Sequence, residues 1–305
     1  MTVKLPDDCG IISERIFEAS KKLIEYNYWD NIEEHELSAW INNFLSEEEK
    51  YFAAVLLNSL IYRNSSAIKT FGAQLFHIII PNYLEEKGIY EIESIDSWLR
   101  LLNQSGSRGV LPFRFTTVEA IDNKPAKSGA TIFRELKRHF FDSDLGVGCQ
   151  SLSQMVKNPK INTLIIFDDV IGTGEQFETF VKKYNVNQLG YNILYCPLAA
   201  HKSGIERIQK SYPNIDIKPI EILTELHSLF SAKNKLLEIG NATQHIEFLS
   251  FFKTLCDNRQ FKIDSDNYLG KGELALTYLF KDSTPNNNIS AIWYGDENWT
   301  RLAKR

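Results

Sequence analysis

Two adjacent aspartates, Asp168 and Asp169, stand between an apolar run and a glycine-rich turn in the segment 164–176, LIIFDDVIGTGEQ. This order predicts a buried strand that ends in two carboxylates and is followed by a turn and a helix. In an open α/β sheet, ligands bind at the carboxyl ends of the strands. The N–H groups of such a turn and of the helix start attract anions such as phosphate. The segment therefore indicates a ligand site.

The turn and the first helical residues suggest what the ligand is. Gly172 and Gly174 allow a ligand to approach the backbone closely, Thr173 adds a hydroxyl, and Glu175 and Gln176 begin the helix. Carboxylates accept hydrogen bonds from sugar hydroxyls and attract the Mg²⁺ that accompanies a diphosphate. We predict a ribose phosphate as ligand and Mg²⁺ as cofactor, with the two aspartates as catalytic and metal residues. A plain strand-to-helix turn with an acidic helix start is the alternative.

Two further groups of residues are candidates for ligand binding. Lys127, Ser128 and Gly129 stand at the start of a predicted basic helix, which is a second place for an anion. A solvated helix face explains them equally well. His201 and Lys202 follow another predicted strand, so they lie at the same edge of the sheet. A single histidine is more often structural than catalytic.

Apolar residues recur at helical spacing through the first 105 residues, over 12–23, 51–60 and 68–78. Pro81 follows the last of these runs and predicts the end of that helix. From residue 106 onward, short β-rich runs alternate with helical patterns, which predicts βαβ units and a parallel sheet covered by helices. The predicted strands are 110–118, 162–170, 191–200 and 215–223, and the helices between them are 128–140, 175–184 and 203–211.

We therefore expect a helical N-terminal region over residues 1–105 and an α/β domain over residues 106–305. A helix over 243–256 and a strand within 274–280 complete the pattern. The tail 284–305 carries Trp293 and Trp299 and is too apolar for a solvated end. We expect it to pack in the α/β domain, close to the sheet.

Composition restricts the class of protein. Of 305 residues, 43% are apolar, and 34 Lys and Arg against 39 Asp and Glu give a net charge of −5. A basic surface over the whole protein, as nucleic-acid binding would use, is excluded. The four cysteines form no C-x-x-C pair, which favours free thiols in a reducing compartment. No apolar leader or 18-residue apolar run occurs, so we expect a cytoplasmic protein without a membrane segment.

The segment 164–176 resembles the loop of type I phosphoribosyltransferases (PRTases) that binds 5-phosphoribosyl 1-pyrophosphate (PRPP). The resemblance implies that Asp168 and Asp169 hold the ribose 2- and 3-hydroxyls and that residues 172–176 surround the 5-phosphate. It also implies a pyrophosphate loop near Lys127–Gly129. The chain departs from the family pattern at Gly172, where Thr is common, and at the two residues after Gly174, which replace small or hydroxyl residues.

A second resemblance covers nearly the whole chain. Trp40 and Phe44, the variant D-D-x-I-G-T-G and the tail 284–305 are similar to orphan PRTase-like proteins of bacterial conflict systems, which include effectors encoded beside retron reverse transcriptases. The resemblance implies a type I PRTase-like parallel sheet with flanking helices, preceded by a helical region. It implies an anti-phage effector that binds PRPP or a nucleotide with Mg²⁺ in the cytoplasm.

The implied partners are a reverse transcriptase with its RNA/DNA product or another defence protein. The implied activity is that of a phosphoribosyltransferase, a glycosyltransferase acting on ribose 5-phosphate. A non-catalytic nucleotide-sensing or protein-interaction subunit is the alternative. The residues leave the acceptor, the catalytic activity and the oligomeric state open.

Overall fold

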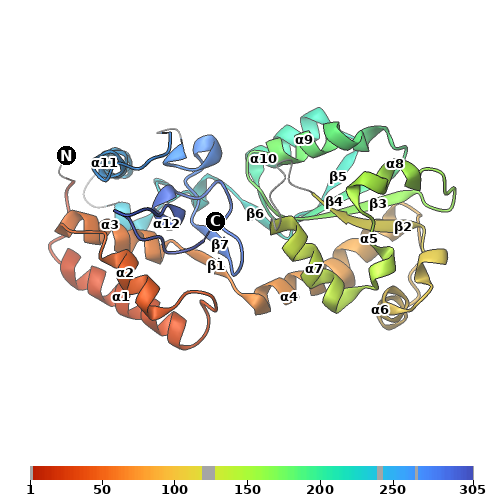
Figure 1. Ribbon diagram of the computed structural model, residues 1–305, viewed down its shortest axis with the longest axis horizontal. Coiled ribbons are helices and arrows are strands. Elements are labelled where there is room, and N and C mark those ends of the chain that lie inside the picture. The colour runs from red at the N-terminus through yellow and green to blue at the C-terminus, as the bar shows by residue number, and fades with distance from the viewer. Residues whose placement is uncertain (1–2, 119–127, 239–242, 265–266, 305) are drawn as a thin grey trace. The chain divides into compact units, whose positions relative to one another are not determined.

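The computed structural model describes residues 3–118, 128–238, 243–264 and 267–304. The chain divides into two compact units (Figure 1). We refer to Ser66–Leu223 as the sheet unit, and to Met1–Ser65 together with Thr224–Arg305 as the helical unit. Each unit is described by itself below.

The sheet unit contains the predicted parallel sheet. Its strands run in the order β2-β3-β4-β5, and β6 pairs with β4 beyond the end of β5. All of these pairs are parallel, and Ile165 in β3 lies between Phe115 and Leu194 of the neighbouring strands. The apolar run before the aspartates is fully buried, as a central strand requires. The strands are β2 (Phe113–Thr117), β3 (Thr163–Ile171), β4 (Asn192–His201), β5 (Ile215–Ile217) and β6 (Glu221–Leu223).

Helices cover both faces of this sheet (Figure 1). On one face, the ring of Phe76 stacks on Phe140 at 5.1 Å between centroids and also contacts Phe167 of β3. On the other face, Phe177 stacks on Tyr195 of β4 at 3.8 Å. The helices of the unit are α4 (Ser65–Gln74), α5 (Ile80–Glu86), α6 (Ile95–Asn103), α7 (Ser128–Phe140), α8 (Leu152–Met155), α9 (Glu175–Tyr184) and α10 (Lys202–Ser211). Short 3₁₀ turns lie at η2 (Ser107–Gly109), η3 (Ser143–Leu145), η4 (Cys149–Ser151) and η5 (Val186–Gln188).

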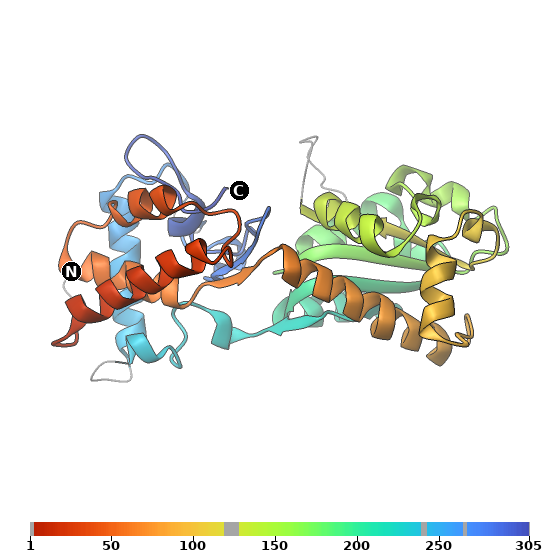
Figure 2. The same ribbon diagram turned by 90° about the horizontal axis from the view of Figure 1, so that it is seen from below.

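The helical path through Pro81 continues, so the predicted helix end there is wrong. A π-helical turn, η1 (Leu75–Ile79), joins α4 to α5, and Pro81 lies in the first turn of α5. The orange ribbon of this region coils on through the junction in Figure 2. Proline lacks the N–H that an α-helix interior needs. The wider π turn changes the hydrogen-bonding pattern just before the proline, with the N–H of Ile80 donating to the carbonyl of Leu75, and this lets the chain continue in helical conformation.

The helical unit joins the two ends of the chain. Strand β1 (Ile61–Arg63) pairs in parallel with β7 (Tyr278–Phe280). Ser46 caps α3 by accepting from the N–H of Glu49. The helices are α1 (Cys9–Glu25), α2 (Glu34–Ile41), α3 (Glu47–Asn58), α11 (Gln244–Asn258) and α12 (Ser290–Trp293). The 3₁₀ turns are η6 (Glu225–His227), η7 (Lys235–Leu237) and η9 (Lys271–Glu273).

These units differ from the expected division at residues 105 and 106. The helices after Ser66 belong to the sheet unit, where Trp98 of α6 packs on Phe113 of β2 at 5.7 Å and donates its indole N–H to the carbonyl of Phe76. The pairing of β1 with β7 places the C-terminal residues from Thr224 onward in the helical unit. Helical spacing alone predicts a buried face but does not identify the surface that buries it.

The tail is buried, as expected, but it belongs to the helical unit rather than to the α/β unit. The ring of Trp299 is 1% exposed and meets Phe44 at 5.1 Å and Phe261 at 4.9 Å, both edge to face. Trp40 donates its indole N–H to the carbonyl of Ala291 at 2.8 Å. The tail therefore completes the core that the N-terminal helices begin.

All four cysteines are buried free thiols, as their spacing predicted. Among the helices of the described ranges, none has the length and apolar character needed to cross a membrane.

We expect Trp299→Ala to lower the free energy of unfolding by about 3–5 kcal/mol, because it removes a fully buried aromatic side chain. Denaturant unfolding followed by circular dichroism measures the loss. Trp293→Ala is the matched control, since Trp293 is only partly buried and should cost less. Equal losses for the two variants would contradict a central role for Trp299 in this core.

Candidate functional site

The candidate site lies where β2, β3 and β4 reach their carboxyl ends. Asp168 and Asp169 lie near the end of β3 and are 3% and 6% exposed. The strand thus carries two acidic groups almost completely out of solvent.

Contacts within the protein hold Asp168. Tyr195 of β4 donates its hydroxyl to Asp168 Oδ2 at 2.7 Å, and the N–H of Asp169 donates to Asp168 Oδ1 at 3.0 Å. Burial and the nearby Asp169 raise the pKa of Asp168 well above its usual value, while the Tyr195 hydrogen bond acts in the opposite direction. Phe177 stacks on the ring of Tyr195 and fixes its orientation. Asp168 is therefore anchored on both of its oxygens.

The predicted phosphate-binding turn packs closely against α10. Gly174 has a φ of 81°, a conformation that favours glycine, and it precedes the first residue of α9. A Cβ at Gly204 of α10 would lie 2.2 Å from the carbonyl oxygen of Gly172, so only glycine permits this approach. Thr173 is partly exposed in the same turn. The turn and the start of α10 thus form one packed structure.

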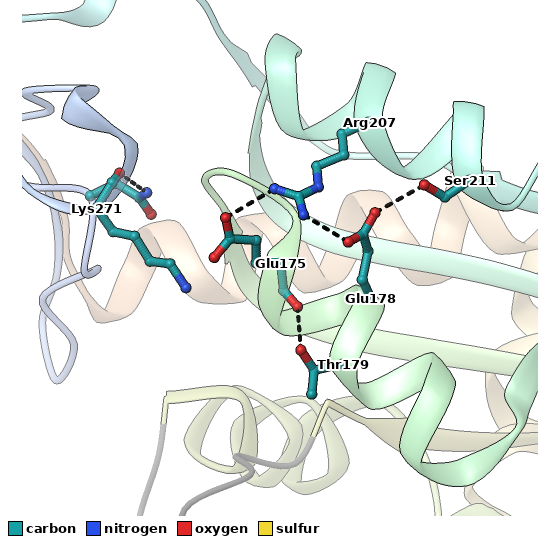
Figure 3. A network of polar contacts seen from close by, with 7 residues as sticks. Glu175, Glu178, Thr179, Arg207, Ser211 and Lys271 are labelled. Carbon is teal, nitrogen blue, oxygen red and sulfur yellow. Dashed lines mark hydrogen bonds and ion pairs between the residues drawn. The ribbon is translucent and has the colours of Figure 1, made fainter.

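Glu175 and Gln176 form the first turn of α9, and Gln176 is exposed. The Glu175 carboxylate accepts a hydrogen bond from Arg207 of α10, 3.0 Å from Nη1 to Oε1 (Figure 3). Arg207 also donates through Nη2 to Glu178 at 2.9 Å. Ser211 donates its hydroxyl to the other oxygen of Glu178 at 2.9 Å. The Arg207 hydrogen bond is the main cause of the lowered pKa of Glu178.

Of the second candidate group, Lys127 lies outside the described residues. Ser128 is the first residue of α7, and Gly129 follows it. A Cβ at Gly129 would lie 2.8 Å from Thr117 Oγ1 and 3.1 Å from Asp168 Oδ1. The start of α7 therefore lies directly beside Asp168 and Thr117. The Thr117 hydroxyl is buried and has no hydrogen-bond partner among the described residues.

The third candidate group has local structural contacts. His201 is the last residue of β4 and is buried. It caps α10, because its Nδ1 accepts from the N–H of Ser203. Lys202 forms an exposed ion pair with Glu206, 3.7 Å apart and one helical turn away. Binding of a ligand by either residue stays a prediction.

The donor set at the end of β3 suits Mg²⁺ that is shared with a ligand. Mg²⁺ in phosphate sites commonly uses one or two protein carboxylates together with phosphate oxygens and water. Within the described ranges, no three His, Cys, Asp or Glu side chains are grouped to hold a metal ion. Binding of Mg²⁺ by the two aspartates stays a prediction, and Tyr195 holds one of them, Asp168, in place.

Three residues of this site were not identified from the sequence. Tyr195 lies inside an apolar strand, and its contact with Asp168 depends on how β3 and β4 pair. Thr117 ends β2 and could have been noted as a hydroxyl at the same sheet edge. Arg207 lies within a helix rich in exposed charge, so no pattern distinguishes it.

A family model described as PRTase-CE matches residues 37–305, which span the sheet, the aspartates and the tail. The chain belongs to the PRTase-CE family. The PRTase-like identification made from the sequence is therefore confirmed, and so is the α/β fold with a parallel sheet and a helical N-terminal part. A search of curated proteins finds no match to this PRTase-CE protein.

We expect Tyr195→Phe to lower the free energy of unfolding by about 1.5–3 kcal/mol, because a buried carboxyl group loses a hydroxyl donor. Denaturant unfolding measures this loss in the parent protein and in the Asp168→Asn background. The loss should be smaller in the second background, since the two side chains act on each other. Identical losses in both backgrounds would show that the hydrogen bond contributes nothing.

Proposed function

We propose that this PRTase-CE protein binds PRPP or a ribose-phosphate nucleotide together with Mg²⁺ at the carboxyl ends of β2, β3 and β4. One observation carries the proposal. Two buried carboxylates at the end of β3 lead through a glycine turn directly into α9, within a chain of a PRTase-like family. Carboxylates accept from sugar hydroxyls, and the turn with the helix start favours an anion.

Each part of the site has a distinct role in this proposal. The N–H groups of the turn from Gly172 to Gln176 bind the 5-phosphate. Asp169 and Asp168 accept from the ribose hydroxyls, and Tyr195 keeps Asp168 in place. Mg²⁺ with the ligand supplies positive charge that offsets the carboxylates and the phosphates.

Ribosyl transfer to a base or another acceptor is the activity we propose for this site. The protein then acts by positioning and electrostatic stabilisation, without a protein nucleophile. Binding without turnover is the second candidate, and the observation that favours it is the carboxylate of Glu175 in the turn. Assays of labelled ribosyl transfer across several bases separate the two. Product formation supports the transferase, and binding alone supports a sensing subunit.

We expect ribose 5-phosphate or PRPP with Mg²⁺ to raise the melting temperature of the protein. A ligand at a hundred times its Kd adds about 2.7 kcal/mol of stability. The double variant Asp168→Asn with Asp169→Asn keeps the side-chain shapes, so it should stay folded and lose most of this shift. The proposal fails if no ribose phosphate shifts the melting of the parent protein at millimolar concentration.

We further propose a role in bacterial anti-phage defence, supported by the resemblance of the D-D-x-I-G-T-G segment and the tail to effectors of conflict systems. A reverse transcriptase with its RNA/DNA product, or another defence protein, is the proposed partner. In a strain that carries the protein with its neighbouring genes, the double aspartate variant should lose protection in plaque assays. Full protection by that variant would contradict a defence role for this site.

A further inference from the structure

The turn that we propose for the 5-phosphate ends in a carboxylate. Glu175 is the first residue of α9 and directly follows Gly174, so its negative charge lies beside any phosphate bound by the turn. An acidic residue at a helix start is favourable without a ligand, but it repels an anion at the same N-terminus. A phosphate site here requires that this charge be turned away or neutralised.

The structure shows a positive charge next to the Glu175 carboxylate (Figure 3). The guanidinium of Arg207 contacts two carboxylates at once, Glu175 at 3.0 Å through Nη1 and Glu178 at 2.9 Å through Nη2. The planar guanidinium presents its donors in fixed directions, so one contact orients the other. Glu175 is therefore held toward α10 by a positive charge.

The two carboxylates differ in their surroundings. The Glu178 side chain is 12% exposed and accepts a further hydrogen bond from Ser211, whereas the Glu175 and Arg207 side chains are each 43% exposed. The contact with Glu178 is thus buried and anchors the guanidinium of Arg207. The contact with Glu175 lies at the surface, beside Gly174. An exposed ion pair adds little to stability, so its value lies in where it places charge.

The position of Arg207 relative to the turn is also fixed. Gly204 lies one helical turn before Arg207 on α10, and a Cβ there would overlap the carbonyl oxygen of Gly172. Gly174 packs on the same helix, close to the carbonyl of Gly204 and to Ile208. The distance between the turn and α10, which carries Arg207, is therefore fixed by backbone packing.

We propose that Arg207 is a positioning residue for phosphate binding, which neutralises the Glu175 carboxylate and holds it toward α10. This inference rests on the proposed function of the turn as the 5-phosphate site. It explains how the turn accepts a phosphate although Glu175 occupies the place of a small or hydroxyl residue.

The test measures the Kd of ribose 5-phosphate with Mg²⁺ by titration calorimetry. Arg207→Gln should weaken binding by roughly ten-fold, because it removes the guanidinium charge that lies 3.0 Å from the Glu175 carboxylate beside the phosphate. The double variant Glu175→Gln with Arg207→Gln should recover most of that affinity. Loss of packing between α9 and α10 would not be repaired by Glu175→Gln, so the recovery separates charge placement from a merely structural role.

Lys210→Gln is the matched control, since Lys210 is an exposed cation on the same helix and has no ion-pair partner among the described residues. It should bind as the parent does. An equal effect of Arg207→Gln and Lys210→Gln, or no recovery in the double variant, overturns the inference. If the parent protein itself does not bind ribose 5-phosphate, the proposed function fails. If the parent binds and Arg207→Gln binds equally well, only the role of Arg207 fails.

Discussion

The site depends on the burial of two adjacent carboxyl groups at the end of a central strand. Removing a carboxylate from water is costly unless hydrogen bonds replace the water. In this protein the replacement for Asp168 comes from Tyr195 on the neighbouring strand and from the N–H of Asp169. The hydrogen bond to Asp168 depends in turn on α9, because the ring of Tyr195 is fixed by its stack on Phe177 of that helix. Tyr195 therefore connects the acidic end of β3 to helix α9, through a hydrogen bond to Asp168 on one side and a ring stack with Phe177 on the other.

Helix α7 also approaches Asp168 closely. The start of a helix carries partial positive charge, and the first residues of α7 lie beside Asp168 Oδ1. Gly129 allows this approach, since a larger residue would contact Thr117 and Asp168. A residue that we first considered as a ligand group therefore has a packing role that the structure demonstrates. Binding of an anion by the same helix start is compatible with that role and stays a prediction.

Strands β2 to β4 and the helices α7, α9 and α10 could be predicted from the sequence because each carries its own local signal, whereas α6 and α8 were not predicted and the single strand expected over 215–223 is divided into β5 and β6. The run before Asp168 is continuously apolar, as a strand buried on both faces must be, and α7 and α9 have the predicted bounds. The site residues near the aspartates followed from the same segment. Tyr195 and Arg207 could not be found in this way, since their roles arise from strand register and from packing between helices.

Local sequence patterns could not predict the division into units or the continuation of the helix through Pro81. Apolar spacing near Trp98 predicts a buried face, but the identity of the covering surface, Phe113 of β2, is a long-range fact. Pairing of β1 with β7 joins segments more than two hundred residues apart, and no local pattern encodes such a contact. Pro81 ends an ideal α-helix, yet the preceding π turn changes the hydrogen-bonding pattern and the path continues.

The two ends of the candidate ligand site differ in how they manage charge. At the proposed ribose end, Asp168 is buried and neutral hydroxyl and amide donors satisfy it. At the proposed phosphate end, Glu175 is half-exposed and the guanidinium of Arg207 compensates its charge. Solvent and salt weaken the second arrangement far more than the first. Packing of α10 on the turn through Gly204 then becomes essential, because it keeps Arg207 at the distance where its charge still acts on Glu175. Close backbone packing thus fixes the position of the charged groups near Glu175, whereas burial fixes the position of Asp168.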